Sequence, residues 1–144
     1  MEKSFNELGV EQNLIEGLIK QGIESPTEIQ VKAIPMGLAG EDIIGESETG
    51  TGKTLAYLLP IFQKIDITSK DIQAIILAPT HELAMQIHKQ VELLSVNSNS
   101  LVRSTSIIGN VNIKRQLESL KEKPHIIVGS AGRILELITM KKLK

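Results

Sequence analysis

The sequence predicts an α/β fold in which a parallel β-sheet is sandwiched between helices. Two observations predict it. Segments with helical spacing of apolar residues alternate along the chain with short continuous apolar runs, and a glycine-rich loop connects one such run to one such helix. Alternation of this kind is typical of parallel sheets, because each crossover places a helix over the sheet. The 144 residues correspond to about one domain.

The first two helices follow from apolar spacing and helix-end signals. One helix is expected to end near Gly22, and a second is expected to begin at Thr27, where Gln30 completes a capping box, and to continue until Pro35 disturbs it. The apolar face of the first helix is formed by Leu14, Ile15, Leu18 and Ile19, and the second helix carries Ile29, Ala33 and Ile34 inward.

Later segments repeat the alternation. The glycine loop is followed by a helix with Leu55, Leu58, Leu59 and Phe62 on one face. The continuous apolar run at 72–78 predicts a strand buried on both faces. The remaining elements are expected as a helix whose apolar face is Leu83, Ala84, Ile87, Val91 and Leu94, a loop at 95–100, a strand at 103–108, a helix at 113–120, a strand at 125–128 and a helix at 134–138.

Composition limits the class of protein. Hydrophobic residues make up 41% of the chain and charged residues 23%, as in ordinary globular domains. The sequence has no apolar run of about 20 residues and no signal-peptide core. It has no cysteine, which excludes disulfides and thiolate metal sites and fits a cytoplasmic protein. The net charge of −1 argues against a generic polyanion-binding surface, and only three aromatic residues argue against a base-stacking platform.

The glycine-rich loop predicts phosphate binding. It follows the apolar run 43–45, which is expected to be a strand, and comprises Ser47, Glu48, Thr49, Gly50, Thr51, Gly52, Lys53 and Thr54. The glycines let backbone N–H groups converge on one point, and the helix N-terminus adds partial positive charge. Lys53 is expected to reach the β and γ phosphates, and the Thr54 hydroxyl to hold Mg²⁺. Ser47 replaces the first glycine of the strict pattern. The alternative is a Gly/Thr-rich turn that only caps a helix.

From Phe5 to Arg133 the motifs resemble, in order, those of the first RecA-like domain of the DEAD-box RNA helicases. Residues 22–30 resemble the family's Q motif, with Phe5 as its upstream aromatic. The resemblance implies that Gln30 pairs with adenine and that Phe5 packs on the base, and a carboxamide does match the N7 and N6 positions of adenine. The alternative is that Gln30 only closes the helix cap and that Phe5 belongs to the core.

Three further segments resemble the RNA-contacting motifs of that family. Residues 79–84 resemble motif Ia with His81 in place of an arginine, residues 109–110 stand in place of a Gly-Gly pair, and residues 130–133 stand in place of Thr-Pro-Gly-Arg. The resemblance implies contacts to the RNA backbone from Pro79, Thr80, Gly109, Ser130, Gly132 and Arg133. The alternatives are that Thr80 only caps a helix and that Arg133 is a solvated surface residue.

Two histidines are given no functional role. His88 is expected on the solvent side of its helix. His125 begins a strand without a cluster of ligand-type residues, so no metal is assigned to it.

The sequence contains no Asp-Glu-Ala-Asp tetrad, no Ser-Ala-Thr motif and no second RecA-like domain. The expectation is therefore an N-terminal RecA-like domain fragment over residues 1–144, truncated before the DEAD motif, with the Q motif at about 3–31. It would bind ATP or ADP with Mg²⁺ but not hydrolyse ATP, and it would bind RNA weakly without its C-terminal RecA-like partner domain. The alternatives are a non-catalytic nucleotide or RNA-binding module, or another small P-loop NTPase or kinase.

Overall fold

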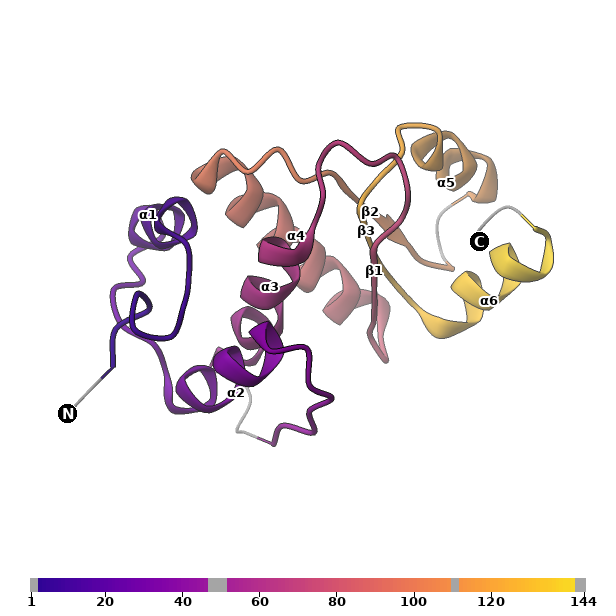
Figure 1. The fold of residues 1–144 in the computed structure, drawn as a ribbon. Helices are drawn as coiled ribbons and strands as arrows, with labels where there is room; N and C mark the ends of the chain where they lie inside the picture. Colours follow the sequence, from indigo (N-terminus) through magenta and orange to yellow (C-terminus); the bar gives the residue numbers. More distant parts are fainter. Residues whose placement is uncertain (1–2, 47–51, 110–111, 142–144) are drawn as a thin grey trace. The chain divides into compact units, whose positions relative to one another are not determined.

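The computed structural model describes residues 3–46, 52–109 and 112–141 (Figure 1). The chain divides into two compact units. The first, here the helical unit, comprises residues 1–65 and 93–101, and the second, the sheet unit, comprises residues 66–92 and 102–144. The helix α4 (His81–Ser98) contributes residues to both units.

The helical unit contains α1 (Gln12–Lys20), α2 (Glu28–Leu38) and α3 (Lys53–Lys64), of which α2 and α3 lie against each other. The apolar face predicted for α3 is confirmed, because its four large apolar side chains are all buried. The run 43–45, expected as a strand before the glycine loop, is not a strand in the structure, and Ile44 is 97% exposed. A strand exists only where a neighbour completes its hydrogen bonds, and no described strand pairs with this run.

Three other expectations for this unit are corrected. Ile19 lies outside the buried face of α1, and Gly17 is buried instead. Pro35 does not end α2, which continues to Leu38 with a hydrogen bond from Ala39 N–H to the Pro35 carbonyl (3.1 Å). The polar stretch at 95–100 is helical as far as Ser98, whose hydroxyl donates to the Leu94 carbonyl (2.6 Å).

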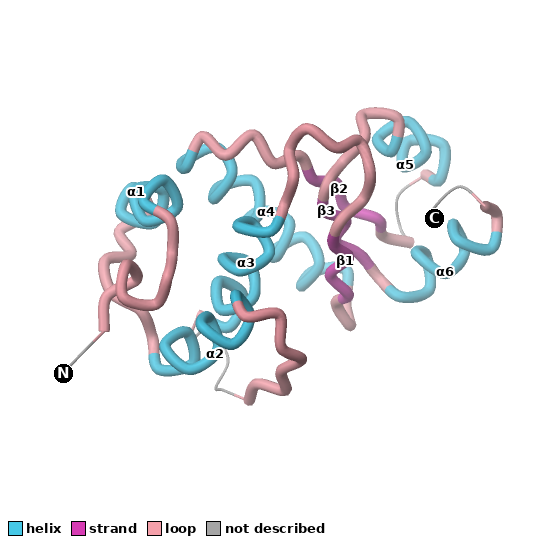
Figure 2. The backbone as a smooth tube through the Cα atoms, viewed as in Figure 1, coloured by secondary structure: helices cyan, strands magenta, loops and turns pink. Residues whose placement is uncertain are grey.

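The sheet unit is built on three parallel strands in the order β1-β3-β2, shown in magenta in Figure 2. They are β1 (Ala74–Leu77), β2 (Ser104–Ile107) and β3 (Ile126–Gly129). The helices α5 (Ile113–Leu120) and α6 (Ala131–Thr139) cover one face, where Ile107 and Ile127 pack with Ile134 and Leu137. The predicted fold class is confirmed: an α/β fold with a parallel sheet flanked by helices.

Strand β1 is not buried on both faces as expected. It lies at an edge of the described sheet, and Ile75 and Leu77 are 45% and 58% exposed. Ile75 pairs with Ile127 and so shares a face with it, because residues directly paired in register point to the same side. The core that α5 and α6 form on that face centres on β2 and β3 and leaves the β1 side chains uncovered.

The expectation for His88 is wrong. Its side chain is only 14% exposed, and Nδ1 lies 3.3 Å from a carboxylate oxygen of Glu92 one helical turn later. Among the residues that the structure describes, no group of three or more His, Cys, Asp or Glu side chains could hold a metal ion. Within the same residues, no helix has the length and apolar character needed to span a membrane.

Candidate functional site

The phosphate-loop sequence ends at the N-terminus of α3. Gly52 is the N-cap residue with φ +88°, a backbone conformation that favours glycine, and Lys53 and Thr54 are the first two residues of the helix. Both of these side chains are half-buried. A Cβ atom at Gly52 would overlap Nε2 of Gln30, so the position also needs glycine for space. Five residues of the predicted loop, Ser47, Glu48, Thr49, Gly50 and Thr51, lie outside the described residues.

Gln30 connects the two helices that flank this site. Its side chain is 2% exposed, its Oε1 accepts from Thr27 N–H (2.9 Å), and its Nε2 donates to the Gly52 carbonyl (3.0 Å). The first bond is the capping interaction expected from the sequence, and the second ties the start of α2 to the start of α3. A carboxamide has two donor hydrogens and two acceptor lone pairs, so each atom retains the capacity for one further bond.

Phe5, the other residue expected at an adenine site, is 2% exposed and lies in the core of the helical unit. Its carbonyl accepts from Leu8 N–H and Val10 N–H, both at 3.1 Å, in the turn that precedes α1. The structure thus buries both Phe5 and Gln30 within one unit.

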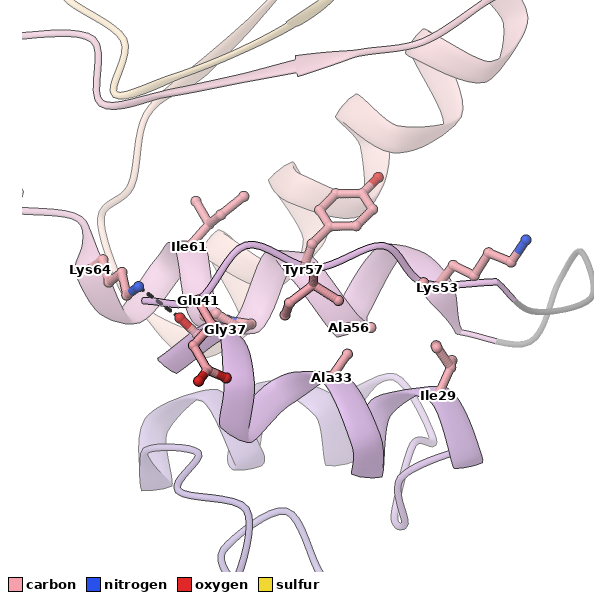
Figure 3. Close-up of a pocket in the computed structure, with 12 residues that line it drawn as sticks. Ile29, Ala33, Gly37, Glu41, Lys53, Ala56, Tyr57, Ile61 and Lys64 are labelled. Atoms are coloured by element: carbon pink, nitrogen blue, oxygen red, sulfur yellow. Dashed lines mark hydrogen bonds between the residues drawn. The ribbon is translucent and has the colours of Figure 1, made fainter. Parts of the chain in front are cut away.

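A cavity of about 400 Å³ lies between α2, α3 and the segment 41–45. Its lining is mainly apolar, with Lys53 at one end and Lys64 at the other (Figure 3). Lys64 Nζ donates to the Gly37 carbonyl (2.7 Å). Lys53 lies at the opposite end of the cavity, where α3 begins. Tyr57 also lines the cavity. Burial raises the pKa of the Tyr57 phenol, and a hydrogen bond with the Thr54 side chain opposes this shift in part.

A second group of predicted residues lies in the sheet unit. Because the three strands are parallel, their carboxyl ends meet at one edge of the sheet. Pro79 and Thr80 follow β1 and are exposed, and the Thr80 hydroxyl accepts from Leu83 N–H (3.1 Å), so Thr80 does cap α4. Gly109 follows β2 and is exposed. A Cβ atom on Gly109 would lie 3.5 Å from His81 Nε2, which places His81 beside this turn.

The segment after β3 completes this edge. Ser130 is the N-cap residue of α6, and its N–H donates to the Ile107 carbonyl (3.0 Å). Its hydroxyl caps no N–H group among the residues that the structure describes. A Cβ atom on Gly132 would meet none of the described atoms within 4 Å, so open space faces this glycine. The residues expected to contact RNA from three separate segments therefore lie along one edge.

Arg133 differs from the others because its guanidinium points into the protein. The side chain is 13% exposed, Nη2 donates to the Gly109 carbonyl (2.8 Å), and Nη1 donates to Gln116 Oε1 (3.1 Å). Nε lies 3.0 Å from a carboxylate oxygen of Glu136. Gln116 was not among the residues expected from the sequence. It shares the helical spacing of Ile113, Leu117 and Leu120. A polar residue on this apolar helix face is the sequence feature that could have pointed to a buried role for Gln116.

Comparison with known proteins agrees with these motifs. Residues 27–144 match the family model for the DEAD/DEAH box helicase. The chain is 55% identical over 125 residues to the DEAD-box ATP-dependent RNA helicase CshC of Bacillus cereus, covering 87% of this chain and 32% of that protein. It is 44% identical over 140 residues to the ATP-dependent RNA helicase CshA of Listeria monocytogenes, covering 97% of this chain and 26% of that protein. The chain thus spans about a third or less of these relatives.

A solved structure shares the fold over the whole chain. The crystal structure of a DEAD box protein from the hyperthermophile Methanococcus jannaschii superposes with a TM-score of 0.91 at 36% identity, covering 100% of this chain and 39% of that one. The family match begins at the N-cap of α2 and runs to the last residue, so it includes both groups of residues described above except Phe5. This chain therefore belongs to the DEAD/DEAH box helicase family.

Proposed function

We propose that residues 1–144 form the N-terminal RecA-like, nucleotide-binding part of an ATP-dependent RNA helicase. The observation that carries the proposal is the buried Gln30 amide, which bridges Thr27 N–H and the Gly52 carbonyl. A capping residue needs only the first of these bonds. The second joins the proposed adenine-recognition residue to the backbone that precedes Lys53. The adenine and the phosphates of one nucleotide would therefore contact the same pair of helices, α2 and α3.

The roles follow from the chemistry of the residues at the start of α3. The helix N-terminus and the Lys53 ammonium together favour an anionic phosphate, and the Thr54 hydroxyl offers the oxygen ligand that Mg²⁺ prefers. Mg²⁺ bound with the nucleotide would neutralise phosphate charge. Residues 47–51 would supply backbone N–H groups, and Gln30 with Phe5 would select adenine.

Nucleotide preference tests this assignment. ADP should bind more tightly than GDP, and Gln30→Ala should reduce that preference, because losing one bidentate pair costs roughly 1–3 kcal/mol of discrimination. Isothermal titration calorimetry measures both affinities. Gln12→Ala, at an exposed glutamine of α1, is the matched control and should leave the preference unchanged. Equal affinities for ADP and GDP in the unaltered protein would contradict the adenine site.

We further propose that the edge formed by Pro79, Thr80, Gly109, Ser130 and Gly132 contacts RNA phosphates and sugars. Contacts of this kind position a nucleic acid without reading its sequence. Remodelling of RNA by ATP-driven closure of two domains would belong to a longer protein, since the curated relatives are about three times as long or longer.

Hydrolysis is a separate expectation. The 144 residues contain no Asp-Glu-Ala-Asp tetrad and no Ser-Ala-Thr motif, so we propose that they hold nucleotide without turning it over. Phosphate release with and without RNA should not exceed that of a Lys53→Ala variant. A turnover of about one per second, within the ordinary range of enzymes, would show that these residues carry a complete catalytic site.

A further inference from the structure

The Arg133 guanidinium contacts Glu136, Gln116 and Gly109. Each of its guanidinium nitrogens has a partner at 2.8–3.1 Å: Glu136, Gln116 and the Gly109 carbonyl. Glu136 supplies a negative charge 3.0 Å from Nε, and a carboxylate so close repels a phosphate and offsets the attraction of the arginine. The arginine is thus paired, largely buried and partly neutralised.

Gln116 extends this contact to the preceding residue of the turn. It is 2% exposed, its Oε1 accepts from Arg133, and its Nε2 donates a short hydrogen bond to the Ile108 carbonyl. Two successive carbonyls, those of Ile108 and Gly109, are therefore held by one pair of side chains. A buried amide that uses its donor and its acceptor in this way fixes the backbone that it contacts.

The direction of these carbonyls determines where the N–H group of Gly109 points. The Ile108–Gly109 peptide bond is trans, so the Gly109 N–H points opposite to the Ile108 carbonyl and hence away from Gln116. Gly109 itself is exposed and lies beside His81. Backbone N–H groups are common partners of nucleic-acid phosphates. Gln116 and Arg133 hold the Ile108 and Gly109 carbonyls, and the Gly109 N–H points away from Gln116. This arrangement presents the Gly109 N–H group at the sheet edge.

From this geometry we propose that Arg133 and Gln116 form a clamp, here the Arg133–Gln116 clamp. The clamp holds the backbone at Ile108 and Gly109 so that the Gly109 N–H can bind an RNA phosphate. Arg133 acts as a positioning residue and does not contact the phosphate itself. The inference rests on the proposed RNA-binding edge and assigns Gln116 a part in it.

The salt dependence of RNA binding separates positioning from direct contact. Fluorescence anisotropy with a labelled single-stranded oligoribonucleotide should show that Gln116→Met, which keeps volume but removes both hydrogen bonds, lowers affinity roughly tenfold. Arg133→Gln and Arg133→Lys should each lower it to a similar extent, although lysine retains the charge, because an ammonium cannot reproduce the forked contacts. None of the three should change the slope of log affinity against log salt. The double variant Gln116→Met/Arg133→Gln should be no weaker than either single variant.

Controls separate a local effect from loss of folding. Arg115→Gln removes a positive charge from an exposed position of α5 beside Gln116 and should not weaken binding tenfold. ADP affinity, which belongs to the helical unit, should be unchanged in every clamp variant. In NMR spectra of the ¹⁵N-labelled protein, the Gly109 amide resonance should shift on RNA addition in the unaltered protein but not in Gln116→Met or in Gln116→Glu, which keeps the Arg133 acceptor alone.

Two results would overturn the clamp while leaving the RNA-binding edge intact. One is Gln116→Met that binds RNA as tightly as the unaltered protein. The other combines two observations: Arg133→Lys binds RNA with normal affinity, and Arg133→Gln has a shallower slope of log affinity against log salt. The expected difference in slope is about 0.7, the value of one phosphate contact on a single strand. Failure of the unaltered protein to bind RNA, with ADP binding intact, would instead overturn the proposed edge and the clamp with it.

Discussion

His125 immediately precedes the central strand and has no exposed surface. Its Nδ1 accepts from Arg103 N–H (3.0 Å), so the ring is neutral with the proton on Nε2. Burial and, secondly, the positive charge of Arg103 lower the pKa of His125 below its ordinary value, while the Asp66 carboxylate and the carbonyls of Ile67 and Ser69 oppose the shift. The sequence predicts His125 at the start of a strand, but it does not predict the buried hydrogen bond from the Arg103 backbone, which immediately precedes β2.

This lowered pKa makes stability depend on pH. As pH falls below about 6.5, the unfolded chain binds a proton at His125 that the folded chain does not, so the free energy of unfolding should decrease. The Asp66 pKa is also lowered, chiefly by the Thr68 hydroxyl, but that contribution disappears only below the ordinary carboxyl range near 3.8. Urea unfolding at several pH values between 7 and 5 should show the loss. His125→Asn should reduce it, whereas His81→Asn, at an exposed histidine, should retain it. An equal slope in His125→Asn would contradict the assignment.

At the scale of elements, helix α4 shows why its end could not be predicted. Residues 95–100 are polar and were expected as a loop, yet the helix continues to Ser98 because this turn packs on α1. A Cβ atom at Gly17 would lie 3.0 Å from Ser98 N, and Asn13 Nδ2 donates to the Ser98 carbonyl (3.4 Å). Gly17 and Ser98 are 81 residues apart in the sequence. The local composition of residues 95–100 therefore does not predict that α1 will pack on this turn.

The close approach of α1 to this turn gives a prediction. Gly17→Val should lower the free energy of unfolding by about 1–3 kcal/mol, because the added side chain meets backbone atoms that cannot move aside. Glu16→Val introduces the same β-branched residue at an exposed neighbouring position and should cost less than about 1 kcal/mol. Chemical denaturation of both variants checks the difference. If the two substitutions cost the same, the contact between α1 and Ser98 does not constrain the helix.

The predictability of elements and sites follows the range of the interactions that form them. The faces of α3 and β3 follow from apolar runs, and the phosphate-loop residues follow from a motif that is local in the chain. The apolar run 43–45 predicts a strand, but strand pairing depends on a neighbouring strand, and the structure has no strand there. The Arg133–Gln116 clamp joins residues 17 positions apart, and only the folded sheet edge brings their side chains to one pair of carbonyls.

At the scale of the whole molecule, the sheet unit leaves an apolar strand uncovered. Within the described residues, β1 pairs with β3 on one side and has no partner strand on the other. Its outward side chains Ile75 and Leu77 are 45% and 58% exposed, beside a row of backbone groups able to pair with another strand. Unprotected edges of this kind are templates for association between molecules.

We therefore expect the 144-residue chain to associate as its concentration rises. Sedimentation velocity should show larger species, and the double variant Ile75→Thr/Leu77→Thr should return the protein toward a monomer, because threonine keeps the strand preference but reduces the apolar surface. Leu135→Thr, at a side chain of α6 that is 63% exposed but lies on no strand edge, is the matched control and should change little. A protein that remains monomeric throughout would show that this edge is protected. An equal effect of Leu135→Thr would show that exposed apolar area in general, and not β1, drives association.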